Sequence, residues 1–127
     1  EFRRVLFRSP EILILDEPTT YLDVSYQVEV LELVRRLNRE LGITIVMVLH
    51  DINLAARYSD YLAAVKNGVL FTAGTPDEMV TEKNLRDIFE IEAAVYRDPI
   101  HGCPYFIPQR TTFDIKPNSK THGGKNE

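Results

Sequence analysis

The chain has 127 residues, a formal net charge of −4 at pH 7, and hydrophobic and charged contents of 44% and 27%. This length fits one domain or part of a larger protein, and the acidic balance with scattered basic residues argues against a nucleic-acid partner. The single cysteine, Cys103, excludes an internal disulfide and fits a reducing compartment. Its turn-like setting, HGCPY, favours a small turn residue over a nucleophile. The longest apolar run, residues 43–49, is far shorter than the roughly 18 residues of a membrane span.

The N-terminal segment, residues 1–9, reads EFRRVLFRS and matches the in-frame translation of a common short-read sequencing adapter. We interpret it as a non-native segment and leave it out of the fold prediction, although a natural basic strand is the alternative. The continuous apolar run at 12–15, ILIL, then predicts a short strand that is covered on both faces. Pro18 predicts a turn directly after Asp16 and Glu17.

An amphipathic helix is predicted at 26–41, with Asp23 or Ser25 as its N-cap and Gly42 as its stop. Its expected apolar stripe consists of Val30, Leu33, Val34, Leu37 and Leu41. The β-branched run at 43–49 predicts a second buried strand, which ends at His50 and Asp51. A short helix is expected at 52–60.

The second half of the chain carries local signals for turns and helix starts. Asn-Gly at 67–68 predicts a hairpin between strands at 61–66 and 69–73. Thr75, Pro76 and Glu78 have the spacing of a capping box with proline at the first helical position, and a further helix is expected near 82–89. A small terminal hairpin is expected from 92–98 and 103–108. The alternation of strands and helices predicts an α/β fold with a mainly parallel sheet.

Polar side chains follow the first two predicted strands at the point where each strand ends. In α/β sheets ligands bind beyond the carboxyl ends of the strands, and consecutive elements usually pack together, so Asp16, Glu17 and His50 are expected to converge. Hydrolysis of a phosphoanhydride needs Mg²⁺, a group that orients water, and a donor at the γ-phosphate. Asp16 suits the metal, Glu17 suits the water, and His50 suits the γ-phosphate or the water. A solvated carboxylate pair and a structural histidine are the alternative for each residue taken alone.

The ordered set of motifs resembles a known family. ILILDEPTTYLD at 12–23 resembles the Walker B motif and D-loop of an ABC-transporter ATPase, and VMVLHD at 46–51 resembles its switch-histidine strand. Within that family, VKNGVLFTAGTPDEMVT and DPIHGCPYFIP resemble the ATPases of iron(III)–siderophore importers, with haem and cobalamin importers as near relatives. The resemblance implies the C-terminal part of a P-loop NTPase with a RecA-like core at 10–91, and a β extension at 92–108. A disordered polar tail is expected at 109–127.

The resemblance also implies a role for each matching residue. Asp16 would bind the Mg²⁺ of Mg-ATP, and Glu17 would be the general base. Asp23, in the D-loop, would face a second ATPase subunit across the nucleotide, and His50 would sense the γ-phosphate. Tyr21 stands where many relatives carry Ala or Asn, and its chemical role is open.

Two motifs of the family are missing from the sequence. No stretch matches the phosphate-loop pattern G-x-x-x-x-G-K-[ST], and no LSGGQ-like signature precedes Pro10. The expectation is therefore that the chain is the C-terminal part of a longer ATPase and is inactive by itself.

The expected partners are a second copy of the ATPase, a permease and, indirectly, a substrate-binding protein, at the cytoplasmic face of a bacterial inner membrane. The alternatives are a non-catalytic ABC-type interaction module, a haem or cobalamin importer ATPase, and a soluble ABC ATPase acting on DNA or ribosomes. The acidic balance disfavours the last.

Overall fold

The computed structural model describes residues 12–115, so the adapter-like segment 1–9 and the tail 116–127 lie outside the described residues. The chain forms two compact units that meet in the sequence between Tyr58 and Ser59. The predicted extents of the ATPase part at 10–91 and of the β extension at 92–108 stay predictions. The terminal hairpin joins the second unit because its first strand packs on the preceding helix.

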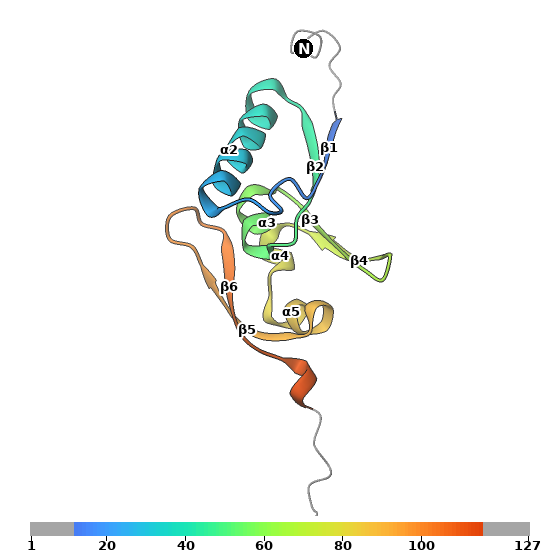
Figure 1. The fold of residues 1–127 in the computed structure, drawn as a ribbon. Helices are drawn as coiled ribbons and strands as arrows, with labels where there is room; N and C mark the ends of the chain where they lie inside the picture. The colour runs from blue at the N-terminus through green and yellow to red at the C-terminus, as the bar shows by residue number, and fades with distance from the viewer. Residues whose placement is uncertain (1–11, 116–127) are drawn as a thin grey trace, which may run out of the picture. The chain divides into compact units, whose positions relative to one another are not determined.

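The first unit is a strand–helix–strand crossover followed by a short helix. It consists of β1 (Ile12–Asp16), α2 (Val24–Leu41), β2 (Thr44–Val48) and α3 (Ile52–Tyr58). The two strands are parallel neighbours, with Ile12 opposite Thr44 and Asp16 opposite Val48 (Figure 1). The predicted adjacency of the first two strands is confirmed.

Helix α2 begins after Asp23, which has the extended backbone of an N-cap but makes no capping hydrogen bond with its side chain. The helix stops at Gly42, as predicted. Gly42 adopts the left-handed conformation (φ 70°), and its amide donates to the Asn38 carbonyl oxygen at 3.0 Å. Glycine takes this conformation without the steric cost that a Cβ would impose.

The predicted burial of the strands is wrong for one face of the sheet. Ile12 and Ile14 are 66% and 72% exposed, and Val46 is 51% exposed. Side chains alternate between the two faces of a strand, and α2, which packs against β2, can cover only one of them. Within residues 12–115 the other face stays open to solvent.

The predicted stripe of α2 is also wrong in part. The buried residues are Leu31 and Val34, whereas Leu33 and Leu41 are each 47% exposed. At 3.6 residues per turn, Leu33 lies about 200° around the helix from Leu31 and therefore on the opposite side.

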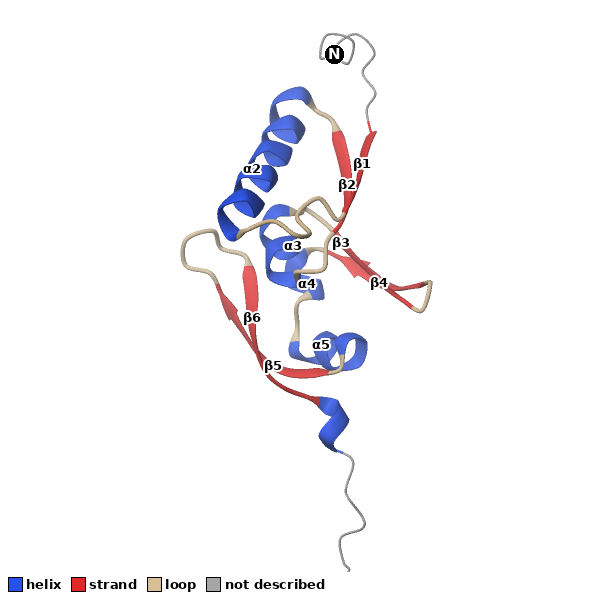
Figure 2. Ribbon diagram, in the orientation of Figure 1, coloured by secondary structure: helices blue, strands red, loops and turns tan. Residues whose placement is uncertain are grey.

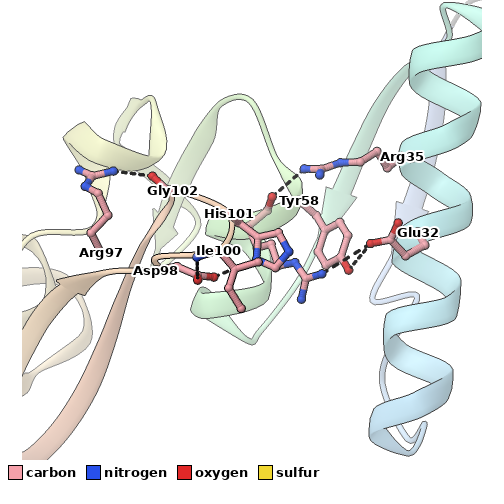
Figure 3. Close-up of polar contacts among 9 residues, drawn as sticks. Glu32, Arg35, Tyr58, Arg97, Asp98, Ile100, His101 and Gly102 are labelled. Carbon is pink, nitrogen blue, oxygen red and sulfur yellow. Dashed lines mark hydrogen bonds and ion pairs between the residues drawn. The ribbon is translucent and has the colours of Figure 1, made fainter.

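Tyr58, at the end of α3, is buried in the first unit and contacts α2 (Figure 3). Its hydroxyl donates to Glu32 Oε2 at 2.7 Å, and the guanidinium carbons of Arg35 and Arg57 lie 5.0 and 4.8 Å from its ring centroid. Arg35 also donates to the Arg57 carbonyl oxygen at 2.7 Å. These contacts join the two helices through one aromatic ring.

The second unit contains two antiparallel hairpins with helices between them (Figure 2). Its elements are β3 (Leu62–Lys66), β4 (Val69–Gly74), α4 (Pro76–Met79), α5 (Glu82–Phe89), β5 (Ile91–Arg97), β6 (Pro104–Thr111) and the 3₁₀ helix η1 (Thr112–Ile115). Ala64, Met79 and Ile88 form its buried cluster, against which Leu62 packs. Among the described strands only β1 and β2 pair in parallel, so the expected parallel sheet is present as a single pair.

The local signals of this unit are confirmed. Asn67 and Gly68 both have positive φ, 52° and 75°, as the predicted Asn-Gly hairpin turn requires. Thr75 accepts from the Glu78 amide, and the Glu78 carboxylate accepts from the Thr75 amide, which completes the capping box before Pro76. The predicted helix near 82–89 and the terminal hairpin are also present.

The predicted start of a disordered tail at residue 109 is wrong for residues 109–115. Strand β6 continues to Thr111, which pairs with Ile91, and the Thr112 amide donates to the Glu90 carbonyl oxygen at 2.9 Å. The pairing uses main-chain groups, which every residue type except proline supplies in full, so a polar composition does not end it. In the described part of the chain no helix is long and apolar enough to span a membrane.

Candidate active site at the ends of β1 and β2

Strand β1 delivers two carboxylates to the point where it ends beside β2. Asp16 is the last residue of β1 and lies opposite Val48, and the Glu17 amide continues the pairing by donating to the Val48 carbonyl oxygen at 2.9 Å. Glu17 then adopts a left-handed backbone conformation, with φ of 55°. A non-glycine residue in this region is uncommon and carries a steric cost that the surrounding structure must offset.

Glu17 and His50 meet across the two strand ends. The distance between Glu17 Oε2 and His50 Nε2 is 2.8 Å, although the residues are 33 positions apart in sequence. The Glu17 side chain is 37% exposed and that of His50 is 74% exposed, so the pair is open to solvent on the His50 side. The predicted convergence of these two residues is confirmed.

Thr20 makes a second contact with the same carboxylate. Its hydroxyl donates to Glu17 Oε1 at 3.2 Å, so each carboxylate oxygen has one neighbouring hydrogen-bonding group. The hydrogen bond with His50, followed by that from Thr20, lowers the pKa of Glu17. Glu17 is therefore ionised at neutral pH, which is the form that accepts hydrogen bonds from water.

The turn that presents Thr20 is stabilised by main-chain hydrogen bonds. The Thr20 amide donates to the Glu17 carbonyl oxygen, and the Leu22 amide donates to the Thr19 carbonyl oxygen, each at 3.2 Å. Thr19 is buried, whereas Tyr21 has a positive φ of 69° and a fully exposed side chain. Thr20 was not among the predicted site residues. Its hydroxyl three residues after Glu17, in a turn marked by Pro18, was the available signal.

The remaining predicted residues do not join this contact. Asp16 is exposed, and by strand alternation it lies on the same face of β1 as Ile12 and Ile14. Asp23 is exposed at the start of α2. In residues 12–115 no hydrogen bond or ion pair connects either side chain to Glu17 or His50. Asp51 has a structural role, because its Oδ1 accepts from the Leu54 amide at 3.0 Å in the first turn of α3.

A dedicated protein cage for a metal ion is not present among the described residues, where no group of three or more His, Cys, Asp or Glu side chains gathers. Mg²⁺ in nucleotide sites takes only one or two carboxylates, keeps several waters and binds the substrate phosphates. The exposed carboxylate of Asp16 at the end of β1 is of the type that such a nucleotide site uses, and it does not form a structural metal site.

The fold resembles that of ATPase domains from ABC transporters. A solved structure described as a metal-chelate type ABC transporter in an inward-facing conformation matches with a TM-score of 0.65, over 78% of this chain and 40% of that chain, at 24% identity. At this identity the match supports the fold alone. No family model matches the sequence.

Similar proteins of known type identify the family. The chain is 48% identical over 103 residues to the petrobactin import ATP-binding protein FpuD of Bacillus anthracis, covering 81% of this chain and 38% of that protein. It is 44% identical over 115 residues to the iron(3+)-hydroxamate import ATP-binding protein FhuC of Bacillus subtilis, covering 91% and 41%. The chain spans about two fifths of the length of these relatives. It belongs to the family of ABC-transporter ATP-binding proteins.

Proposed function

We propose that this chain is part of the ATP-hydrolysing subunit of an ABC importer that takes up iron(III)–siderophore complexes. The contact between Glu17 and His50 at the ends of two parallel strands carries the proposal, because it places an ionised carboxylate and an imidazole where α/β sheets bind ligands. Two relatives that are 48% and 44% identical are import ATP-binding proteins, one of them for iron(3+)-hydroxamate. A haem or cobalamin complex is the alternative cargo.

Each residue of the site has a distinct task in this proposal. Glu17 accepts a hydrogen bond from the attacking water and orients it toward the γ-phosphate of ATP. His50 holds one oxygen of that carboxylate and presents the rest of its exposed ring to the nucleotide. Asp16 holds Mg²⁺, which when bound neutralises charge on the phosphate oxygens. Asp23 faces a second ATPase subunit.

The assembly follows from the same proposal. Two copies of the ATPase act together on a permease at the cytoplasmic face of a bacterial membrane, and a substrate-binding protein delivers the cargo to the permease. The 127-residue chain by itself does not bind Mg-ATP tightly, because its sequence contains no phosphate-loop pattern to hold the phosphates.

The test uses the full-length protein that contains this chain. Glu17→Gln keeps the size of the side chain and removes its charge, and it should lower kcat for ATP hydrolysis by about 10²- to 10⁴-fold with a nearly unchanged KM. Glu29→Gln, an exposed carboxylate of α2, is the matched control and should leave both constants unchanged. Near-normal turnover by the Glu17→Gln protein would overturn the catalytic role of Glu17, whereas an unsubstituted full-length protein that does not hydrolyse ATP would favour a non-catalytic interaction module. Micromolar Mg-ATP binding by the 127-residue chain in a calorimeter would contradict the proposed inactivity of that chain.

A further inference from the structure

The Glu17 carboxylate is held at both oxygens, and only one of the two contacts comes from His50, which follows β2. His50 Nε2 lies 2.8 Å from Oε2, and the Thr20 hydroxyl donates to Oε1 at 3.2 Å. A glutamate side chain has three rotatable bonds, and its terminal torsion is broad, so a single contact leaves the carboxylate plane free to rotate. Two contacts on different oxygens define both the position and the plane of the group.

The backbone around Thr20 places its hydroxyl for this contact. Glu17 has a left-handed backbone, and the Thr20 amide donates to the Glu17 carbonyl oxygen, which closes a tight four-residue turn. Thr19, between them, is 8% exposed and anchors the turn in the interior of the unit. Thr20 itself is exposed, so water could satisfy its hydroxyl equally well. Thr20 therefore donates to Glu17 although its hydroxyl could instead bond to water.

We propose that Thr20 is a positioning residue that orients the Glu17 carboxylate, so that Oε2 remains within hydrogen-bonding distance of His50. The inference rests on the proposed function, since the water-orienting role of Glu17 is itself a proposal. Thr20 touches neither water nor nucleotide in this role and acts only through Glu17. Small displacements of a reacting group lower rates strongly, so loss of the Thr20 hydroxyl should lower kcat roughly 10-fold or more.

The test compares Thr20→Val, which has nearly the same shape and no hydroxyl, with Thr20→Ser, which restores the hydroxyl. Thr44→Val is the matched control, because Thr44 is an exposed threonine at the start of β2. Two readouts are needed. One is the position of the Glu17 side chain relative to His50 in crystal structures of the 127-residue chain or, in solution, the ¹⁵N resonance of His50 Nε2. The other is kcat and KM for ATP in the full-length protein.

The expected result has three parts. In Thr20→Val the Glu17 carboxylate adopts more than one orientation and separates from His50, kcat falls, and KM stays within about twofold of the original value. Thr20→Ser restores the contact and the rate, and Thr44→Val changes neither. An unchanged Glu17–His50 contact in Thr20→Val, or a rate loss that Thr20→Ser does not restore, would overturn the proposal. Loss of the contact in a protein that never hydrolyses ATP would instead refute the proposed function and leave the positioning role intact.

Discussion

Two substitutions of Tyr58 can separate the contribution of its hydroxyl group from that of its ring to the packing of α3 on α2. Tyr58→Phe removes only the hydroxyl that donates to Glu32 Oε2, whereas Tyr58→Leu also removes the ring beside Arg35 and Arg57. A hydrogen bond to a charged acceptor contributes about 1.5–3 kcal/mol. The Glu32 side chain is 46% exposed and can be hydrated after the loss, so the lower end of that range applies to Tyr58→Phe.

The ring contributes separately. A cation–π contact near the surface contributes about 0.5–1 kcal/mol, and Tyr58 has two of them. Tyr58→Leu should therefore lower the free energy of unfolding of the first unit by about 3 kcal/mol, roughly twice the effect of Tyr58→Phe. Tyr61→Phe is the control, because Tyr61 is 74% exposed and its substitution should cost less than about 0.5 kcal/mol.

The assay is urea denaturation followed by circular dichroism, together with amide hydrogen exchange. Exchange is needed because the chain forms two units that can unfold separately, and the loss should appear in α2 and α3. Equal losses for Tyr58→Phe and Tyr58→Leu would refute the contribution of the two guanidinium groups. A loss that appears only in the second unit would refute the helix-to-helix role of Tyr58.

Tyr58 should also make the stability of the first unit depend on pH in the alkaline range. Burial, and then the hydrogen bond to Glu32, raise the pKa of Tyr58 above its ordinary value near 10. The folded state thus keeps the phenol proton to higher pH than the unfolded state. The corresponding stability is fully present below about pH 10 and is lost as the pH rises through the folded pKa. Tyr58→Phe should lack this alkaline component, which denaturation curves measured between about pH 9 and pH 11 can show.

Three further substitutions test other parts of the structure. Leu85→Ala, at a side chain that is 1% exposed, should cost about 2–5 kcal/mol in urea denaturation, while Leu70→Ala, 60% exposed, should cost less than about 0.5 kcal/mol. Thr75→Ala should cost about 1 kcal/mol by removing the N-cap of α4, and Thr75→Ser should restore most of it in the same assay. The hydrogen bond from His101, followed by that from a main-chain amide, lowers the pKa of Asp98, so its contribution to stability is present above about pH 4 and is lost as the pH falls through the folded pKa. Asp98→Asn should flatten the stability profile below about pH 4, and an unchanged acid slope would contradict this assignment.

The part of the site that depends only on which strands are neighbours could be predicted from the sequence. Asp16, Glu17 and His50 each follow an apolar run, and a short crossover makes the two strands neighbours, so the convergence of Glu17 and His50 could be expected from residue types and spacing. The expected convergence of Asp16 with them is not seen, because in residues 12–115 its side chain makes no hydrogen bond or ion pair with Glu17 or His50. A one-residue shift along a strand moves a side chain to the other face, and the left-handed backbone of Glu17 ends the alternation at that residue.

What the sequence determined by itself is the local chemistry of the chain. The Asn67–Gly68 turn, the Thr75 capping box and the Gly42 helix stop each depend on the conformational preferences of a few neighbouring residues, and all three were predicted and are present. Tertiary structure decided which face of β1 and of α2 is buried and how far β6 extends beside β5. These features depend on contacts between distant segments and on the path of the backbone in space. Spacing along the chain does not encode either of them.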